Sequence, residues 1–294
     1  MANDRATFSA TLALLARKGL KYSTVFDLGC ADGHFFVQHH ALFAGSVPVN
    51  IDANALYEPS LRAIQETLGG HYRIAAMSDQ PGELELNVAS HPYWGSLRGD
   101  GDPYWDRLNG LRGSVQRVPA IRLDDLAAEL ALKPPYLLKL DIQGAEVQAL
   151  RGAQGVLANT SVVVCEADMN DFQAINTALL ASGFRLYDVT ELNYGVDRSL
   201  GWFYPVYLHA RHADLIPANF WREADNEAAI RSQVERRKNI LARLNHELAR
   251  IRSSQPPRRR ALVRTAYRRL SYAAWPRSSP ASARSIRRTT LSRP

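Results

Sequence analysis

The N-terminal part of the sequence places glycines and an acid where a strand gives way to a helix. The apolar run 24–28 ends at Gly29, and Gly33 follows before a stretch that can form a helix. A glycine has no Cβ, so such a turn can take a positive φ and lie directly against a ligand. A strand, a tight turn and a helix start together allow the backbone to approach a nucleotide-like ligand closely. Asp27, at the end of the strand, adds a carboxylate suited to a cationic ligand.

A second acid stands where a ribose could be bound. The segment 47–52 reads as a strand that ends in Asp52, and this acid lies about 20 residues beyond Gly33. That spacing is typical of a carboxylate that binds a ribose, because it can accept from both hydroxyls at once. A third strand, 74–77, ends at Ser78 and Asp79. Ligands bind at the carboxyl ends of parallel strands, so these polar residues are expected to share one edge of a sheet.

Two later strand ends also carry acids. The run 136–141 ends in Asp141, with Glu146 on the helix that follows, and the run 161–166 ends in Glu166. We expect these carboxylates to face the same cleft and to orient a substrate. A second interpretation is that Asp141 binds Mg²⁺ with Glu166 or Asp168, because this ion prefers oxygen ligands.

These motifs resemble those of two nested groups of enzymes. Asp-x-Gly-x-Ala-x-Gly at 27–33 resembles the first motif of methyltransferases that use S-adenosylmethionine (SAM), with Ala31 where a glycine is more usual. The stretch 137–153, LLKLDIQGAEVQALRGA, resembles the FkbM-type methyltransferases, which show Lys-x-Asp, then Gly-Ala-Glu, then Leu-x-Gly-Ala. It departs from that pattern at Gln143, where the family usually has an acid. The resemblance extends over residues 24–210 and includes the Ser-Leu element at Ser96.

The resemblance implies a fold, a cofactor and a reaction. The fold is α/β, a doubly wound, mostly parallel seven-stranded sheet of the Rossmann-like class I type, followed by a C-terminal helix and a basic tail. The reaction is SAM-dependent methyl transfer to a hydroxyl of a sugar, glycan or secondary metabolite. Two alternatives are a non-catalytic SAM-fold scaffold that acts through the C-terminal helix and tail, and a nucleotide-dependent oxidoreductase, which the glycine spacing disfavours.

The resemblance also assigns residues. The third strand end would lie beside the adenine, where Asp79 could accept from the exocyclic amine. The expected cofactor-binding residues are Asp27, Gly29, Ala31, Gly33, Asp52, Ser78 and Asp79. The expected catalytic residues are Asp141, Glu146 and Glu166.

The pattern of elements agrees with a parallel sheet covered on both faces. Apolar strands alternate with helical segments, and this alternation is typical of α/β folds. The last two strands are joined by a loop too short for a crossover helix, so they should pair antiparallel. The expected strands lie near 25–28, 47–52, 74–77, 136–141, 161–167, 184–189 and 203–210, with extra β segments near 83–88 and 115–122 and a helix over 4–18.

Composition favours an intracellular protein. The 294 residues are 46% hydrophobic and include two cysteines, both in predicted core strands or at their ends. That usage indicates a reducing compartment without a disulfide framework. No apolar run reaches the length of a membrane span. We therefore expect a cytoplasmic protein.

The basic charge belongs to the C-terminus. The chain carries 36 basic and 29 acidic residues, and the segment after Arg252 has eleven arginines and no acid. The rest of the chain is therefore mildly acidic, and nucleic-acid binding by the body is not expected. The expected organisation is a methyltransferase domain over 1–215, a helix over 216–252 and a largely disordered tail over 253–294.

The two C-terminal segments predict partners of different kinds. Apolar residues at 225–251 recur at alternating four- and three-residue steps, interrupted by Arg237. This spacing predicts a short coiled coil and hence a homodimer, or a helix packed on its own domain. In the tail, apolar residues between Leu262 and Trp275 recur at helical spacing beside arginines. Such a helix would hold the protein at the inner face of an anionic membrane; the alternative is a solvated, disordered tail.

Overall fold

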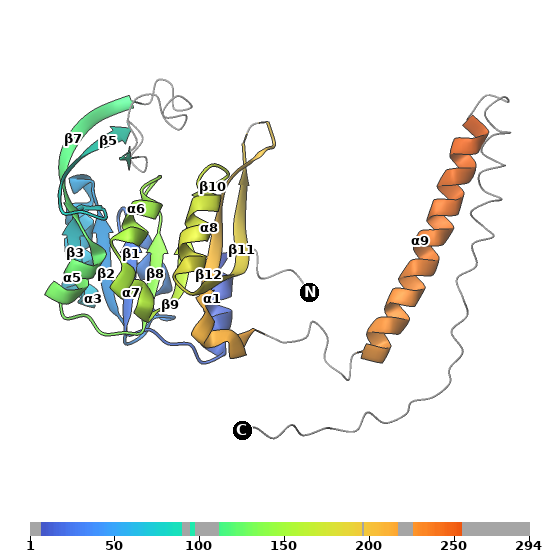
Figure 1. Ribbon diagram of the computed structural model, residues 1–294, viewed down its shortest axis with the longest axis horizontal. Coiled ribbons are helices and arrows are strands. Elements are labelled where there is room, and N and C mark those ends of the chain that lie inside the picture. Colours follow the sequence, from blue (N-terminus) through green and yellow to red (C-terminus); the bar gives the residue numbers. More distant parts are fainter. Residues whose placement is uncertain (1–6, 90–94, 98–111, 196, 217–225, 255–294) are drawn as a thin grey trace, which may run out of the picture. The chain divides into compact units, whose positions relative to one another are not determined.

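The structure is a computed structural model, and it describes residues 7–89, 95–97, 112–195, 197–216 and 226–254. The chain divides into two compact units, 1–217 and 218–294. The first unit is an α/β domain built on one large sheet (Figure 1). The two Pro-Tyr-Trp motifs and the basic tail lie outside the described residues.

The large sheet has eight strands in the order β10-β12-β9-β8-β1-β2-β3, with β11 pairing with β12. Its central strands are parallel, and β10, β11 and β12 pair antiparallel at one side. β10 continues the direction of β9 after a break at Glu166, so both pair with β12. The strands are β1 (Thr24–Leu28), β2 (Val47–Asp52), β3 (His71–Ile74), β8 (Tyr136–Leu140), β9 (Thr160–Cys165), β10 (Ala167–Asp168), β11 (Phe184–Tyr194) and β12 (Leu200–His209).

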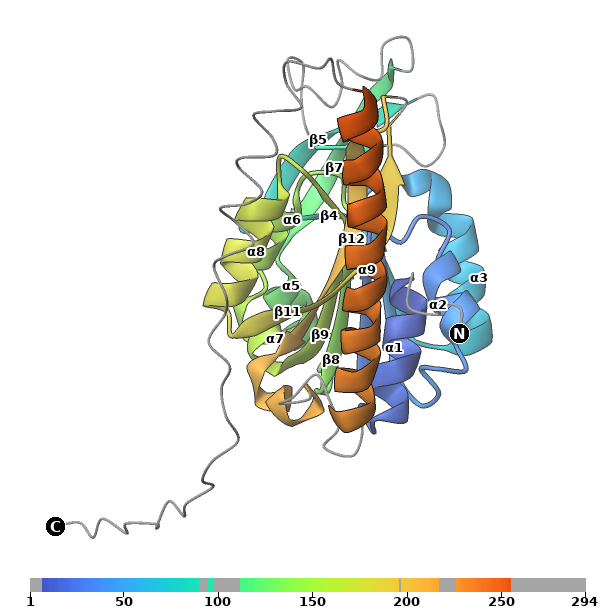
Figure 2. The ribbon, with the colours of Figure 1, turned by 90° about the vertical axis from the view of Figure 1, so that its right-hand side faces the viewer.

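Helices cover both faces of this sheet, as the alternation of strands and helices predicts. In Figure 2, α1, α2 and α3 lie on one side of the sheet, and α5, α6, α7 and α8 lie on the other. The helices and 3-10 turns of this domain are α1 (Phe8–Arg17), α2 (His34–His39), η1 (Ala55–Tyr57), α3 (Glu58–Leu68), α5 (Leu123–Glu129), α6 (Glu146–Arg151), α7 (Gln154–Asn159), α8 (Phe172–Ala181) and η2 (Ala210–Leu215).

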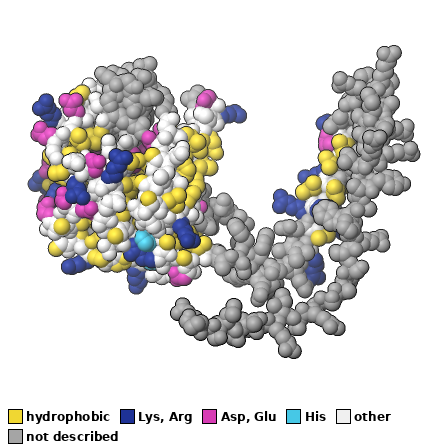
Figure 3. Space-filling view, viewed as in Figure 1, with side chains coloured by type: hydrophobic (Ala, Val, Ile, Leu, Met, Phe, Trp, Pro, Cys, Tyr) yellow, Lys and Arg dark blue, Asp and Glu magenta, His cyan; other side chains and the backbone are white. Residues whose placement is uncertain are grey.

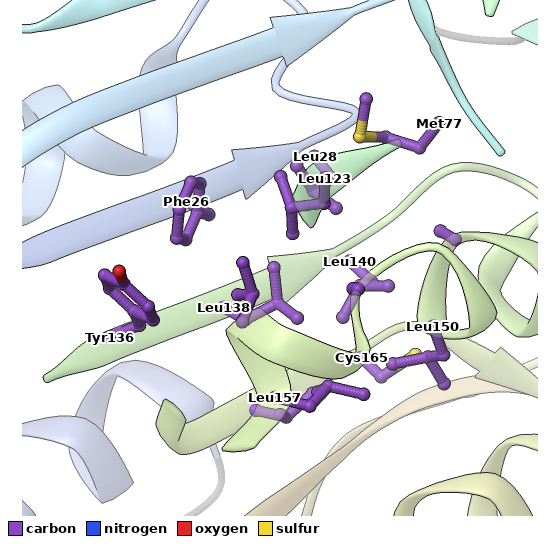
Figure 4. Packing of buried hydrophobic residues seen from close by; sticks show 14 of the residues in the cluster. Phe26, Leu28, Met77, Leu123, Tyr136, Leu138, Leu140, Leu150, Leu157 and Cys165 are labelled. Atoms are coloured by element: carbon purple, nitrogen blue, oxygen red, sulfur yellow. The ribbon is translucent and has the colours of Figure 1, made fainter. Parts of the chain in front are cut away.

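Alternate residues of the fully buried central strands supply the two cores. Leu138 and Leu140 of β8 belong to the cluster that includes α6 and α7, whereas Leu137 belongs to the cluster that includes α1 and α2. Figure 4 shows the first of these clusters, with Phe26 and Tyr136 in edge-on contact. Strands buried on both faces read as continuous apolar runs, and this explains why β1, β8 and β9 are visible in the sequence.

A smaller sheet stands beside the end of the large one. Its order is β4-β7-β5-β6, and Figure 1 shows β5 and β7 rising above β2 and β3. The long pair β5 and β7 confirms the β segments expected near 83–88 and 115–122. Its strands are β4 (Ala76–Met77), β5 (Gly82–Ala89), β6 (Gly95–Ser96) and β7 (Arg112–Ile121).

The third strand lies earlier than the sequence indicates. Residues 71–74 form β3 in the large sheet, whereas Ala76 and Met77 pair with β7 in the small one. The Ala75 amide donates to the Asp52 carbonyl and ends the pairing with β2, after which the chain crosses to the second sheet. The apolar run 74–77 therefore spans a change of sheet, which its hydrophobicity could not reveal.

The second unit contains α9 (Asn226–Ser254), a helix of 29 residues. The sequence predicts a C-terminal helix over 216–252; α9 overlaps this range from residue 226, and residues 217–225 lie outside the described ranges. No helix within the described ranges is long and apolar enough to cross a membrane.

Candidate functional site

A cavity of about 850 Å³ opens at the carboxyl ends of β1, β2 and β8. This volume lies within the range of small-molecule and cofactor sites. Residues of the small sheet and of β12 also contribute to its wall. Among the described residues that line it, the charged side chains are all acidic: Asp52, Asp141, Glu146, Glu166, Asp168, Asp171 and Asp197.

A second cavity of about 1130 Å³ lies on the side of α1, α2 and β11. The two cavities share Gly29, Ala31, Asp141 and Tyr204 as lining residues. Asp141 and Tyr204 therefore stand at the boundary between two spaces that a cofactor and an acceptor could approach.

Asp52 lies at the end of β2 and holds the neighbouring backbone. One carboxylate oxygen accepts from the Ala31 amide at 2.8 Å and the other from the Asn54 amide at 2.8 Å. Each oxygen retains a second lone pair, so the carboxylate can still accept from two ribose hydroxyls. Burial raises the pKa of Asp52 to about 6, against the opposing effect of the two amides. The residue thus has the position and the acceptors that the sequence predicted for ribose binding.

The glycine turn has the expected positive φ angles, but its residues have different structural roles. Gly29 and Ala31 line the cavity, both with positive φ, at 71° and 47°. A Cβ on Gly29 would lie 1.8 Å from the Asp141 carbonyl oxygen, so the absent side chain lets two strand ends approach. Gly33, also at positive φ, lines neither cavity; a Cβ there would meet Ile64 of α3 at 2.3 Å.

Asp27 is buried below the turn and lines neither cavity. Its side chain is 1% exposed and accepts from the Lys139 ammonium at 3.1 Å. Lys139 also donates to Asp141 at 3.3 Å, and its ammonium lies 5.7 Å from the centre of the Phe35 ring. Burial lowers the pKa of Lys139, but the two carboxylates outweigh it and raise that pKa overall. The structure therefore places Asp27 as the charge partner of Lys139.

Asp141 and Glu166 form a pair of acids with one shared donor. The Gln143 amide lies 3.1 Å from Asp141 Oδ1 and 2.6 Å from Glu166 Oε2. The Tyr204 hydroxyl donates to Asp141 Oδ2 at 3.0 Å. Burial, and then the Asp141 charge, raise the pKa of Glu166 well above its usual range. Burial works to raise the pKa of Asp141, but Lys139 and the other donors lower it. Of the two acids, Asp141 is thus the one whose charged form the surroundings favour, and Glu166 the one whose neutral form they favour.

Glu146 supports the turn that follows β8. Its two carboxylate oxygens accept from the backbone amides of Ile142 at 3.2 Å and Gly144 at 2.9 Å. Burial raises the pKa of Glu146 to about 7. It lines the cavity, but with both oxygens bound to this turn it acts as a positioning residue for Asp141 and Gln143.

Ser78 and Asp79 line neither cavity. Their backbone packs against α6, because a Cβ on Gly152 would be 2.1 Å from the Ser78 carbonyl oxygen. The neighbouring residues Ala75, Ala76 and Met77 line the cavity instead. An adenine in this position would therefore meet an apolar wall rather than the carboxylate of Asp79.

Several lining residues were not predicted as site residues, among them four with polar or aromatic side chains. Asn54 and Tyr57 follow Asp52, while Trp202 and Tyr204 come from β12. The sequence could have indicated Asn54, because this residue follows the strand-end acid Asp52 by two positions. The tyrosine that meets Asp141 is 63 residues away in sequence, and only the pairing of β9 with β12 brings it there.

The expected magnesium ligands do not form a metal cluster among the described residues. No group of three or more histidine, cysteine, aspartate or glutamate side chains in that part of the chain is arranged to hold a metal ion. Asp168 accepts from the amides of Asn170 and Asp171, at 2.7 and 3.0 Å, and so caps the turn before α8.

The sequence matches one known protein family. Residues 27–186, more than half of the sequence, match the methyltransferase FkbM domain. The chain belongs to the FkbM methyltransferase family. This match confirms the resemblance that the motifs predicted. FkbM domains are SAM-dependent methyltransferase domains, so SAM is the methyl donor that membership implies. No curated protein matched the sequence.

The solved structures that this chain matches are remote from it in sequence. A precorrin-6y C5,15-methyltransferase from Geobacter metallireducens is 9% identical, with a TM-score of 0.36 over 70% of this chain and 90% of the other. A putative tRNA (m1A22) methyltransferase from Streptococcus pneumoniae, in complex with SAM, is 9% identical, with a TM-score of 0.37 over 73% and 76%. A putative O-methyltransferase from Klebsiella pneumoniae is 12% identical, with a TM-score of 0.36 over 71% and 84%.

The residues of the FkbM domain suit SAM. Asp52 could hold the ribose, the apolar wall at 75–77 could receive the adenine, and the acids match a cationic ligand. In the FkbM segment, Asp141 and Glu146 line the same cavity and Lys139 binds Asp141 from behind it, so the two motifs meet at one site.

Proposed function

We propose that the protein is a SAM-dependent O-methyltransferase that acts on a hydroxyl of a sugar, glycan or secondary metabolite. The observation that supports this most is a single cavity that contains both Asp52 and the Asp141–Glu166 pair. An acid suited to a ribose and an acid pair able to meet an acceptor thus share one cavity. Trp202, which is exposed at its rim, offers an aromatic face to a ring-shaped acceptor.

The bound cofactor would supply an activated methyl group. The chain therefore mainly aligns the acceptor and accepts the proton that the acceptor loses. A hydroxyl must lose a proton as it is methylated. Asp141 is the ionised acid at the boundary of the two cavities, and we assign it the role of accepting that proton or orienting the hydroxyl. Glu166, whose raised pKa favours its neutral form, would act as a hydrogen-bond donor when it is protonated, and Glu146 would hold the turn.

The first test is a transfer assay with SAM labelled in its methyl group. The purified protein would be incubated with panels of glycans, lipids and secondary metabolites, and methylated products identified by mass spectrometry. We expect a product methylated on oxygen. Methylation only on nitrogen or carbon would contradict the proposed acceptor group, whereas SAM binding without any transfer would favour the scaffold.

A binding measurement separates the oxidoreductase alternative. Calorimetry with SAM and with NADH should show binding of SAM alone. Binding of NADH in preference to SAM would contradict the proposal.

A further inference from the structure

The helix α9 carries a row of exposed apolar side chains. Val234, Leu241 and Leu244 are 50%, 46% and 48% exposed. They lie at the spacing of seven and three residues that puts side chains on one stripe of a helix. Figure 3 shows apolar and basic side chains along the described part of this helix.

A helix of this kind depends on packing for its stability. Its 29 residues correspond to about 43 Å of helix. Its surface ion pairs, Glu235 with Lys238 at 3.2 Å and Glu247 with Arg250 at 3.0 Å, are exposed and contribute little stability. Most of the stability of a helix in a protein comes from packing of an apolar face.

We propose that α9 pairs with α9 of a second copy of this chain in an antiparallel, two-stranded arrangement. Arg237 interrupts the apolar stripe, between Val234 and Leu241, and it decides the orientation. In a parallel pair, Arg237 would lie against the partner's Arg237, and two like charges would be buried together.

The antiparallel pair removes this conflict. When Leu241 lies opposite the partner's Leu244, Arg237 lies opposite the partner's Leu248, beside the partner's Glu247. The same contacts occur twice because a two-fold pair is self-complementary. Each Arg237 thus gains an acidic neighbour, and the leucines still meet along the stripe.

The oligomeric state of the full-length protein tests the pairing. Light scattering coupled to gel filtration should give twice the 32.8 kDa mass of the chain. Leu241→Gln with Leu244→Gln should reduce the mass to that of a monomer. The control, Asn239→Gln with Ala242→Gln, alters the opposite face of the same helix and should leave the dimer intact. Circular dichroism would establish that all variants remain folded.

A charge exchange tests the orientation. Arg237→Glu should dissociate the dimer by placing this acid beside the partner's Glu247, and Arg237→Glu with Glu247→Arg should restore it. A parallel pair would not be rescued in this way. A monomeric wild-type protein at micromolar concentrations, or a dimer that survives the two leucine changes, would overturn the proposal. Neither result depends on methyl transfer.

Discussion

The surroundings of each carboxylate assign it a separate task. Asp52 and Glu146 bind backbone amides, whereas Asp141 and Glu166 share the Gln143 amide. Burial raises the pKa of Asp52 to about 6 and that of Glu146 to about 7. The strand-end pattern could place these acids at one edge of the sheet, but most of the donors that distinguish them, apart from Lys139 on β8, come from neighbouring loops and from β12.

Replacing Glu146 by Gln should destabilise the protein at low pH more than at high pH. A glutamine can accept from only one of the two amides of Ile142 and Gly144, and one lost partner costs roughly 1–3 kcal/mol. In addition, the wild-type pKa of Glu146 rises from 4.5 to about 7 on folding. The protonated wild-type residue therefore adds stability, roughly 3 kcal/mol, that is complete below the unfolded pKa and is lost as pH rises through about 7.

Urea unfolding of wild type and Glu146→Gln between pH 5 and pH 8 would check this. The difference in unfolding free energy should shrink as pH rises. Glu66→Gln, at an exposed position of α3, is the control and should change stability little at any pH. A constant difference between wild type and Glu146→Gln would show that Glu146 keeps an ordinary pKa.

Asp141→Asn should lower turnover and leave SAM affinity nearly unchanged. The change removes the ionised group that faces the acceptor, and loss of general-base assistance costs about 100-fold or more. Steady-state kinetics with an acceptor from the screen, together with calorimetry for SAM, would measure both effects. Asp197→Asn, at an exposed position of the same cavity, should keep most of the activity. Equal activity of Asp141→Asn and wild type would place the acceptor elsewhere.

Strands can be predicted from the sequence where their burial produces a recognisable hydrophobic pattern. β1, β8 and β9 are buried along their whole length and mostly apolar, because helices cover both of their faces. The end of β3 and the start of β4 could not be predicted, because a single apolar run contributes residues to two different sheets. Nor could the sequence show that Ser78 and Asp79 turn toward Gly152, since this depends on how the two sheets pack.

The end of α5 supplies a prediction about an element. Ala131 follows the helix with φ at 48°, a left-handed conformation that favours glycine. The Leu132 amide donates to the Ala127 carbonyl at 3.0 Å and closes the helix end. Ala131→Gly should therefore stabilise the protein by about 0.5–1 kcal/mol, because relief of backbone strain exceeds the added freedom of the unfolded chain.

Thermal unfolding would measure this effect. Ala128→Gly, at an exposed position inside the same helix, is the matched control and should destabilise by about 1 kcal/mol. If both glycines lower the midpoint, the left-handed conformation of Ala131 is not a source of strain.

The molecule as a whole separates a mildly acidic body from a basic end. Eleven arginines follow Arg252, in a segment that lies mostly outside the described residues. We predict that this tail binds anionic membranes and is dispensable for methyl transfer. Each basic residue near such a surface contributes about 1 kcal/mol, and salt should weaken the binding.

Co-sedimentation of the full-length protein and of a chain truncated before Ser253 would test the tail. The full-length protein should sediment with anionic vesicles and not with neutral ones, and the truncated protein should stay in solution. Equal sedimentation of both proteins would contradict the tether. Stronger binding to RNA than to anionic vesicles would identify nucleic acid as the partner of the tail.

Calorimetric titration with SAM tests the central claim most directly, because it needs no acceptor. The wild-type protein should bind one SAM per chain, more weakly as the pH falls through about 6, where Asp52 becomes protonated. Asp52→Ala should weaken binding about tenfold or more, by the loss of charge-assisted hydrogen bonds worth roughly 1.5–3 kcal/mol. Asp125→Ala, an exposed acid on α5, should bind as wild type does. Unchanged SAM affinity in a folded Asp52→Ala protein would contradict the assignment of this cavity to the cofactor.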